Sequence, residues 1–112
     1  MRKGTISLAI ACLAMAGLML AQGKKGGAAG DAAKGKEVFD QCSVCHNTDN
    51  DEVKVGPSLK GLFKHDKLKN GKAVNDANVR AMINAGGNGM PAFADLLSEE
   101  EKTDVIAYLK TL

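Results

Sequence analysis

Five residues near the middle of the chain, Cys42-Ser43-Val44-Cys45-His46, restrict what it can fold around more than any other stretch. They spell C-x-x-C-H, in which two thiols are spaced to add across the two vinyl groups of one haem. The histidine that follows directly is placed to bind the iron, because a neutral imidazole is a good iron ligand. The motif therefore predicts a covalently attached haem, held through Cys42 and Cys45, with His46 on the iron.

Two other chemistries use the same residue types. A structural zinc site needs four thiolate or imidazole ligands in paired spacings, and outside the motif the chain offers only His65 and Cys12. A thiol-disulfide redox module built on Cys42 and Cys45 needs a strand leading into the motif and a βαβ pattern around it. Neither pattern is visible. Haem attachment is the favoured interpretation, and these two remain its alternatives.

The chain is short and poor in aromatic residues. Its 112 residues allow one small domain, and with no Trp, one Tyr and three Phe there is little material for a core. A domain of this size usually needs a metal, disulfides or a cofactor to hold it together. A large apolar macrocycle supplies such a centre, so the composition agrees with the motif.

The first 22 residues have the pattern of an export signal. Arg2 and Lys3 give a positive start, and a charge-free apolar run follows. An uncleaved membrane anchor is the alternative, since the run is only slightly shorter than the roughly 20 residues that span a bilayer. A lipoprotein signal ending at Cys12 is a weaker alternative, because the apolar region before that cysteine is very short. We expect export to the periplasm, in a free or membrane-tethered form.

Residues 23–30 are rich in glycine and lysine and read as a flexible linker, so we expect the folded domain to occupy residues 31–112. That domain carries 11 Lys and Arg against 13 Asp and Glu, a net charge of −2. It has no basic stripe or face, which excludes a nucleic-acid binder. The lysines between positions 60 and 72 are interpreted as a solvated loop.

Two amphipathic helices are predicted at the ends of the domain. Asp31 is a good N-cap, and the residues at helical spacing after it run into the haem motif: Gly35, Val38, Phe39 and Cys42. Gly35 costs about 1 kcal/mol inside a helix relative to alanine, which indicates that another element crosses close by. The expected partner begins with a capping box at Ser98 and presents Val105, Tyr108, Leu109 and Leu112, with Tyr108 over the groove that Gly35 opens.

A third helix is predicted between them. Asn75 or Asp76 caps it, Gly86 ends it, and its inward residues are Val79, Met82 and Ile83. No stretch alternates apolar and polar residues over a useful length, so the expected fold is all-α, with three to five helices. The connection from Asn47 to Val74 is too long for a compact domain unless it wraps something, and a haem is the obvious candidate.

The remaining question is whether a second protein ligand closes the iron. The candidates are His65, Met82 and Met90. Met82 is expected in the core and His65 in solvent. Met90 lies in the glycine-rich stretch 86–91, where the backbone can approach a flat ring and Pro91 stiffens the exit. Met90 is therefore the favoured ligand.

In this order, four segments make the chain resemble the class I c-type cytochromes of the small bacterial monohaem kind: Cys42-Ser43-Val44-Cys45-His46, Gly56-Pro57-Ser58-Leu59, Gly89-Met90-Pro91 and Ile106-Ala107-Tyr108-Leu109. The resemblance covers residues 31–112. It implies His46 and Met90 as the axial ligands, and the carbonyl of Pro57 as acceptor of a hydrogen bond from the other nitrogen of His46. It also implies that Gly35 and Phe39 pack on the last helix.

The function implied is a monomeric one-electron carrier of the periplasm that transforms no substrate. Its expected partners are a membrane quinol-oxidising complex on one side and a terminal oxidase or reductase on the other, with membrane contact through the N-terminal segment. The competing function is a haem enzyme or gas sensor in which Met90 leaves the iron open. The span from His46 to Met90 is shorter than in mitochondrial members, and no Trp is available for a haem propionate, so propionate contacts stay unassigned.

Overall fold

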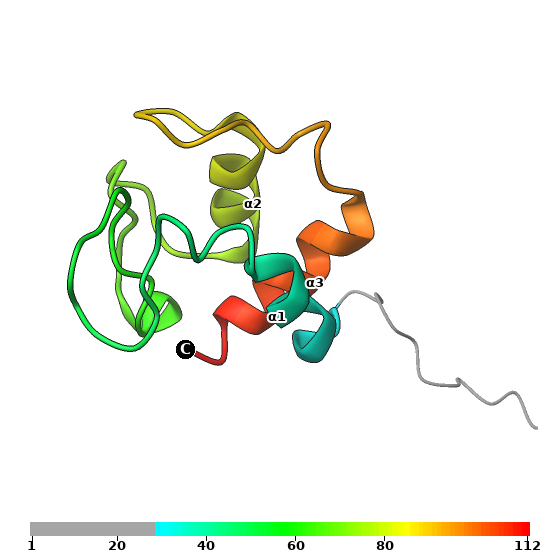
Figure 1. Cartoon of the computed structure of the whole chain (residues 1–112), viewed down its shortest axis with the longest axis horizontal. Helices are drawn as coiled ribbons and strands as arrows, with labels where there is room; N and C mark the ends of the chain where they lie inside the picture. Colours follow the sequence, from blue (N-terminus) through cyan, green and yellow to red (C-terminus); the bar gives the residue numbers. More distant parts are fainter. Residues whose placement is uncertain (1–28) are drawn as a thin grey trace, which may run out of the picture.

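The structure, a computed structural model, describes residues 29–112 and contains three α-helices. They are α1 (Ala32–Phe39), α2 (Asp76–Ala85) and α3 (Glu99–Leu109), joined by long connections that include one 3₁₀ turn, η1 (Leu62–Lys64) (Figure 1). Within residues 29–112 there is no β-strand, only two isolated bridges. The all-α prediction is therefore confirmed. The predicted export signal and most of the predicted linker, residues 1–28, lie outside the described residues.

The helix ends follow the local chemistry of the sequence. The Asp31 side chain accepts hydrogen bonds from two amides of the first turn of α1. Of the two candidate caps for α2, Asn75 takes the role, and Gly86 ends the helix with a φ of 61°. Ser98 and Glu101 form the reciprocal capping box of α3. In this part of the chain, no helix is long and apolar enough to cross a membrane.

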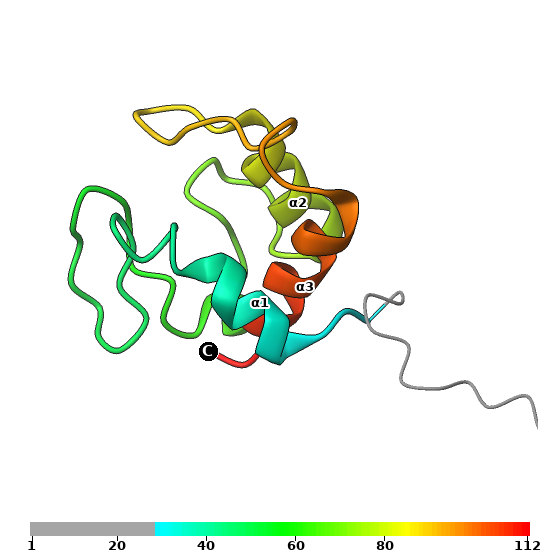
Figure 2. The same cartoon turned by 45° about the vertical axis from the view of Figure 1, so that its right-hand side comes forward.

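Helices α1 and α3 cross in close contact, as both views show (Figures 1 and 2). Gly35 makes the approach possible, because a Cβ there would overlap the backbone carbonyl of Asp104 and lie 2.9 Å from the Cβ of Tyr108. The rings of Phe39 and Tyr108 meet beside it, with centroids 5.3 Å apart and planes tilted by 50°. The predicted crossing of the first and last helices is confirmed.

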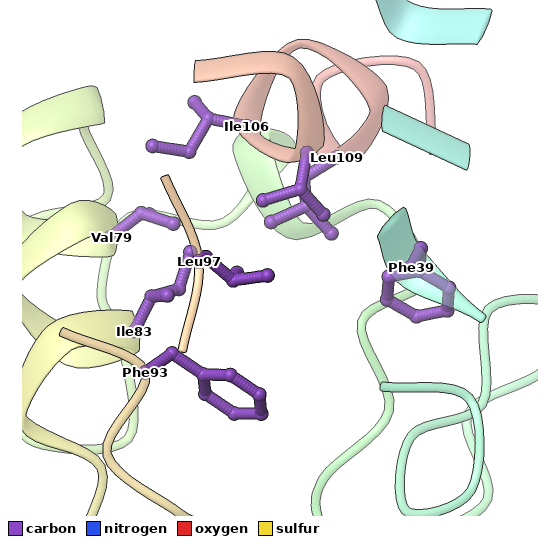
Figure 3. Packing of buried hydrophobic residues seen from close by; sticks show 8 residues of the cluster. Phe39, Val79, Ile83, Phe93, Leu97, Ile106 and Leu109 are labelled. Atoms are coloured by element: carbon purple, nitrogen blue, oxygen red, sulfur yellow. The ribbon is translucent and has the colours of Figure 1, made fainter. Parts of the chain in front are cut away.

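The core gathers residues from all three helices and from the segment that joins α2 to α3 (Figure 3). Its buried apolar members are Phe39, Val79, Ile83, Phe93, Leu97, Val105, Ile106 and Leu109. The expectation that Met82 belongs to this core is wrong: its side chain is half-buried and lies outside the cluster. Two charged residues of α3, Lys102 and Asp104, are buried instead, at 2% and 3% exposure.

Candidate functional site

The C-x-x-C-H motif folds as a series of tight turns directly after α1. The amide of Cys42 donates to the carbonyl of Phe39 at 2.7 Å, and the amides of Cys45 and His46 both donate to the carbonyl of Cys42, at 3.1 and 3.0 Å. Both cysteines are half-buried, and Cys42 packs against the core. The helix that crosses α3 therefore positions the attachment residues next to the apolar interior.

The ring of His46 is oriented by a backbone acceptor. Its Nδ1 lies 2.7 Å from the carbonyl oxygen of Pro57. Because a carbonyl only accepts hydrogen bonds, Nδ1 carries the proton and donates, which leaves the lone pair of Nε2 free to bind a metal. The contact has the geometry that the family resemblance implied for Pro57.

Gly56 lies directly against the same ring. A Cβ placed on Gly56 would lie only 2.5 Å from Cε1 of His46 and 2.9 Å from its Nδ1, so only glycine lets the chain approach so closely. The amide of Gly56 also donates to the carbonyl of Cys45 at 2.8 Å. No role was predicted for Gly56 from the sequence, although its place directly before Pro57 could have indicated one.

The loop of residues 47–58 is held in shape from its first residue. The carbonyl of Asn47 accepts from the amide of Leu59 at 2.8 Å, and its side-chain Nδ2 donates to the carbonyl of Glu52 at 3.0 Å. The hydroxyl of Ser58 donates to the carbonyl of Asn50. These bonds fix where Pro57 meets the imidazole. Asn47 was missed in the sequence, since nothing in its local pattern marks the contacts it makes across the loop.

The environment of the thiols does not suit a thiol-disulfide redox module. Burial raises the pKa of the Cys42 thiol above its ordinary value, and the neighbouring Cys45 raises it further. Redox-active pairs depend on a thiolate whose pKa is lowered. Among residues 29–112 there is no group of three or more His, Cys, Asp or Glu that could hold a metal ion.

The segment from Gly86 to Leu97, which we call the Met90 strap, joins α2 to α3 and is the yellow-to-orange loop at the top of Figure 1. It starts with a tight turn in which Asn88 and Gly89 both have positive φ, 53° and 91°. Two hydrogen bonds between Gly87 and Met90, of 2.9 and 3.0 Å, close the turn. The Asn-Gly pair therefore builds a defined hairpin turn that ends at Met90.

The three sequence candidates for the second iron ligand have different surroundings. Met90 is half-buried and packs against the core. His65 is exposed, as expected, and its Nε2 donates to the carbonyl of Lys60 at 3.3 Å. Met82 lies half-buried on α2. Of the three, only Met90 belongs to the apolar cluster that the motif cysteine Cys42 also contacts.

The chain's own residues fit a haem at this place. Apolar side chains from the long connection and the strap contact the core while keeping part of their surface accessible: Leu59, Leu62, Phe63, Leu68, Val74 and Met90. Figure 3 shows Phe39 of α1 facing Phe93 of the strap across the interior. Two thiols, an imidazole with a free Nε2 and a thioether complete the donor set of a covalently attached haem.

Comparison with known proteins agrees with this site. Residues 30–109 match the family model described as "Cytochrome C oxidase, cbb3-type, subunit III". Cytochrome c2 of Blastochloris viridis is 38% identical over 100 aligned positions, spanning 74% of this chain and 79% of that protein. Cytochrome c6 of Rippkaea orientalis is 42% identical over 82 aligned positions, which span 72% of this chain and 70% of that protein.

Two solved structures share the fold. Cytochrome c6 from the diatom Phaeodactylum tricornutum superposes with a TM-score of 0.59 and 28% identity, covering 73% of this chain and 93% of that one. Cytochrome cH from Methylobacterium extorquens superposes with a TM-score of 0.57 and 27% sequence identity. The match covers 74% of this chain and 100% of that one.

The fold and the site define a small all-α protein built around one covalently bound haem. The chain belongs to the cytochrome c family and is of class I. Its cofactor is haem c, for which Cys42 and Cys45 form the C-x-x-C-H site, and it acts as a monohaem electron carrier. The predictions of haem attachment, fold and electron carriage are confirmed.

Proposed function

We propose that the haem iron is held between Nε2 of His46 and the sulfur of Met90, and that this closed site carries single electrons without transforming a substrate. The observation that carries the proposal is the 2.7 Å hydrogen bond from Nδ1 of His46 to Pro57, since it directs the free nitrogen away from the carbonyl. The hydrogen-bonded turn that ends at Met90 supports Met90 as the second ligand.

The bound haem supplies the redox change, with iron cycling between the ferric and ferrous states. The residues of the chain set the reduction potential of the iron. The Pro57 carbonyl raises the basicity of the imidazole and fixes its tautomer, while a thioether ligand and an apolar lining favour the ferrous state. The potential is therefore higher than with two histidines, and with both positions filled by protein the site has no open position for peroxide, oxygen or nitric oxide.

The surface beside the attachment motif suits brief contact with redox partners. Three valines there are strongly exposed, Val44 at 73%, Val53 at 71% and Val55 at 76%. Hydrogen bonds join the two segments that carry them: Nζ of Lys54 donates to the carbonyl of Ser43 at 3.0 Å, and the amide of Gly56 donates to the carbonyl of Cys45 at 2.8 Å. Small apolar contact areas of this kind fit transient electron-transfer docking.

The protein works in the periplasm after export by residues 1–22, free or tethered, with residues 31–112 as the folded carrier. Its partners are a quinol-oxidising membrane complex as donor and a terminal oxidase or reductase as acceptor. The matched family model is named for a subunit of an oxidase, which supports an oxidase on the acceptor side. The carrier itself is a monomer.

One spectrum of the purified holoprotein and of its Met90→Ala variant tests the ligand assignment. The ferric wild type should show the far-red band of sulfur ligation, and Met90→Ala should lose that band and have a lower reduction potential, because water or another weak ligand replaces the thioether.

The matched control is Met82→Ala, which removes the half-buried methionine on α2 and should leave both the band and the potential unchanged. A band that survives in Met90→Ala, or disappears in Met82→Ala, would disprove the assignment. Wild-type protein with covalent haem but no far-red band would favour the open-site enzyme or sensor.

A further inference from the structure

Lys102 is the most unusual side chain in the described part of the molecule. It is one of the two largest side chains that are fully buried, although lysine is almost never fully buried unless it is paired. Its Nζ donates to the carbonyl of Ala94 at 3.0 Å and to Oε1 of Glu99 at 2.8 Å. Nothing in haem attachment or electron carriage by this chain accounts for a buried ammonium.

The two partners of this ammonium differ in kind. Glu99 is one turn earlier on α3, and its side chain is 78% exposed, so this ion pair reaches into solvent. Ala94 belongs to the Met90 strap, four residues after Met90. The bond to Ala94 is therefore the one that joins α3 to another segment of the chain.

The strap needs such ties because it has no helix or strand of its own between α2 and α3. On the α2 side, the amide of Phe93 donates to the carbonyl of Ile83 at 2.9 Å. On the α3 side, Lys102 reaches the adjacent residue, Ala94. Consecutive strap residues are thus fastened to two different helices just downstream of Met90.

We propose that Lys102 is a positioning residue for the distal iron ligand: its buried ammonium fastens the strap at Ala94 and so keeps Met90 on the iron. The proposal rests on Met90 being that ligand. Releasing Met90 requires the strap to move away from the interior, and such movement breaks the charge-assisted bond between Lys102 and Ala94. The lysine therefore holds the ferric site closed against outside ligands.

The test is imidazole binding to the ferric holoprotein, since imidazole can bind only after Met90 has left. In Lys102→Met the buried stem is preserved and the donor is lost, so we expect imidazole affinity to rise by about tenfold or more, the factor for one hydrogen bond to a charged group. Lys102→Gln keeps an uncharged donor one atom shorter, and its affinity should fall between those of Lys102→Met and the wild type.

Lys110→Met is the matched control. Lys110 is the C-cap of α3, and its Nζ pairs with Asp76 at 2.7 Å instead of with the strap. This variant should bind imidazole as the wild type does. Hydrogen exchange of the holoprotein gives a second readout: the Phe93 amide should exchange faster in Lys102→Met, while the amides of α1 should change only as far as global stability, measured by urea unfolding, has changed.

The outcomes distinguish the role of Lys102 from the assignment of Met90 as iron ligand. Wild-type imidazole affinity and unchanged Phe93 exchange in Lys102→Met would overturn the role of Lys102, as would equal affinities for the Met and Gln variants. If Lys102→Met yields no holoprotein, Lys102→Gln decides by the same two readouts. Failure of the underlying ligand assignment is seen independently, as a wild-type ferric spectrum without the far-red band.

Discussion

Replacing Gly56 by alanine tests whether the 47–58 loop positions the proximal histidine. The φ of Gly56 lies outside the left-handed region, so the backbone itself accepts alanine. The added Cβ, however, would lie 2.5 Å from Cε1 of His46, whereas ordinary contact begins at 3.4 Å. The ring or the loop must therefore shift by about 0.9 Å, the difference between those two values.

Two opposing effects set how much unfolding free energy the Gly56→Ala variant loses. Overpacking a tight site typically costs about 1–3 kcal/mol, and glycine-to-alanine replacement recovers about 0.4–1 kcal/mol by restricting the unfolded chain. The net loss should be about 1–2 kcal/mol. The shift also lengthens the 2.7 Å bond between His46 and Pro57, which lowers the basicity of the imidazole and should raise the reduction potential, because the ferric state loses more stabilisation than the ferrous state.

The assays are urea unfolding of the holoprotein and a redox titration. With a urea slope of about 2 kcal/mol per molar, the midpoint should fall by about 0.5–1 M at an unchanged slope. Val55→Ala is the control, since it introduces alanine at the preceding position, where the side chain is 76% exposed. It should change stability by less than about 0.5 kcal/mol and leave the potential as it is.

A Gly56→Ala protein with wild-type stability and potential would refute the reasoning, because it would show that the ring is not confined by the loop. A loss of stability with no change in potential would limit the role of Gly56 to packing and remove its influence on the imidazole.

Two further predictions concern α3. Gly35→Ala should cost about 3 kcal/mol or more and lower the melting temperature sharply, since the Cβ meets backbone atoms of Asp104 that cannot rotate away; calorimetry of the holoprotein checks this, and a small loss would contradict the crossing geometry. Glu99 has its pKa lowered, first by the hydrogen bond from Lys102, then by the charge of Lys102 and by Arg80. Its ionised form therefore stabilises the fold above the ordinary glutamate value of 4.5, and this contribution is lost as the pH falls through the lowered pKa. Glu99→Gln should lose stability at pH 7 and approach the wild type at low pH in parallel urea titrations, and a constant difference across that range would contradict the assignment.

Features of this protein that depend only on residues near one another in the sequence could be predicted. The motif from Cys42 to His46 is contiguous because two thioethers and an adjacent ligand must meet one haem. The caps Asp31 and Ser98 act within their own helices, so their roles follow from the residues beside them. Gly35 was informative because a glycine inside a helix is costly without a close neighbour.

The errors and omissions have a shared physical cause. Met82 has the spacing of a core residue, yet in the folded protein it is half-buried and outside the cluster. Lys102 is a charged residue and would be expected in solvent. It is buried in the structure, where the Met90 strap lies against it and the carbonyl of Ala94 accepts a hydrogen bond from its Nζ. Such placements depend on how separate segments pack, which no local window contains.

The sequence by itself thus determined the chemistry: one covalent haem, an all-α fold with the caps of its helices, and a methionine in a glycine-rich turn. Local hydrogen bonding, helical periodicity and the spacing of reactive atoms are properties of neighbouring residues, so they can be predicted from the sequence. Only the tertiary structure decided what holds the proposed ligands. The family resemblance already implied the bond from His46 to Pro57. The contact of Gly56 with His46 and the tie from Lys102 to Ala94 join residues 10 and 8 positions apart, and they exist because folding brings those residues together.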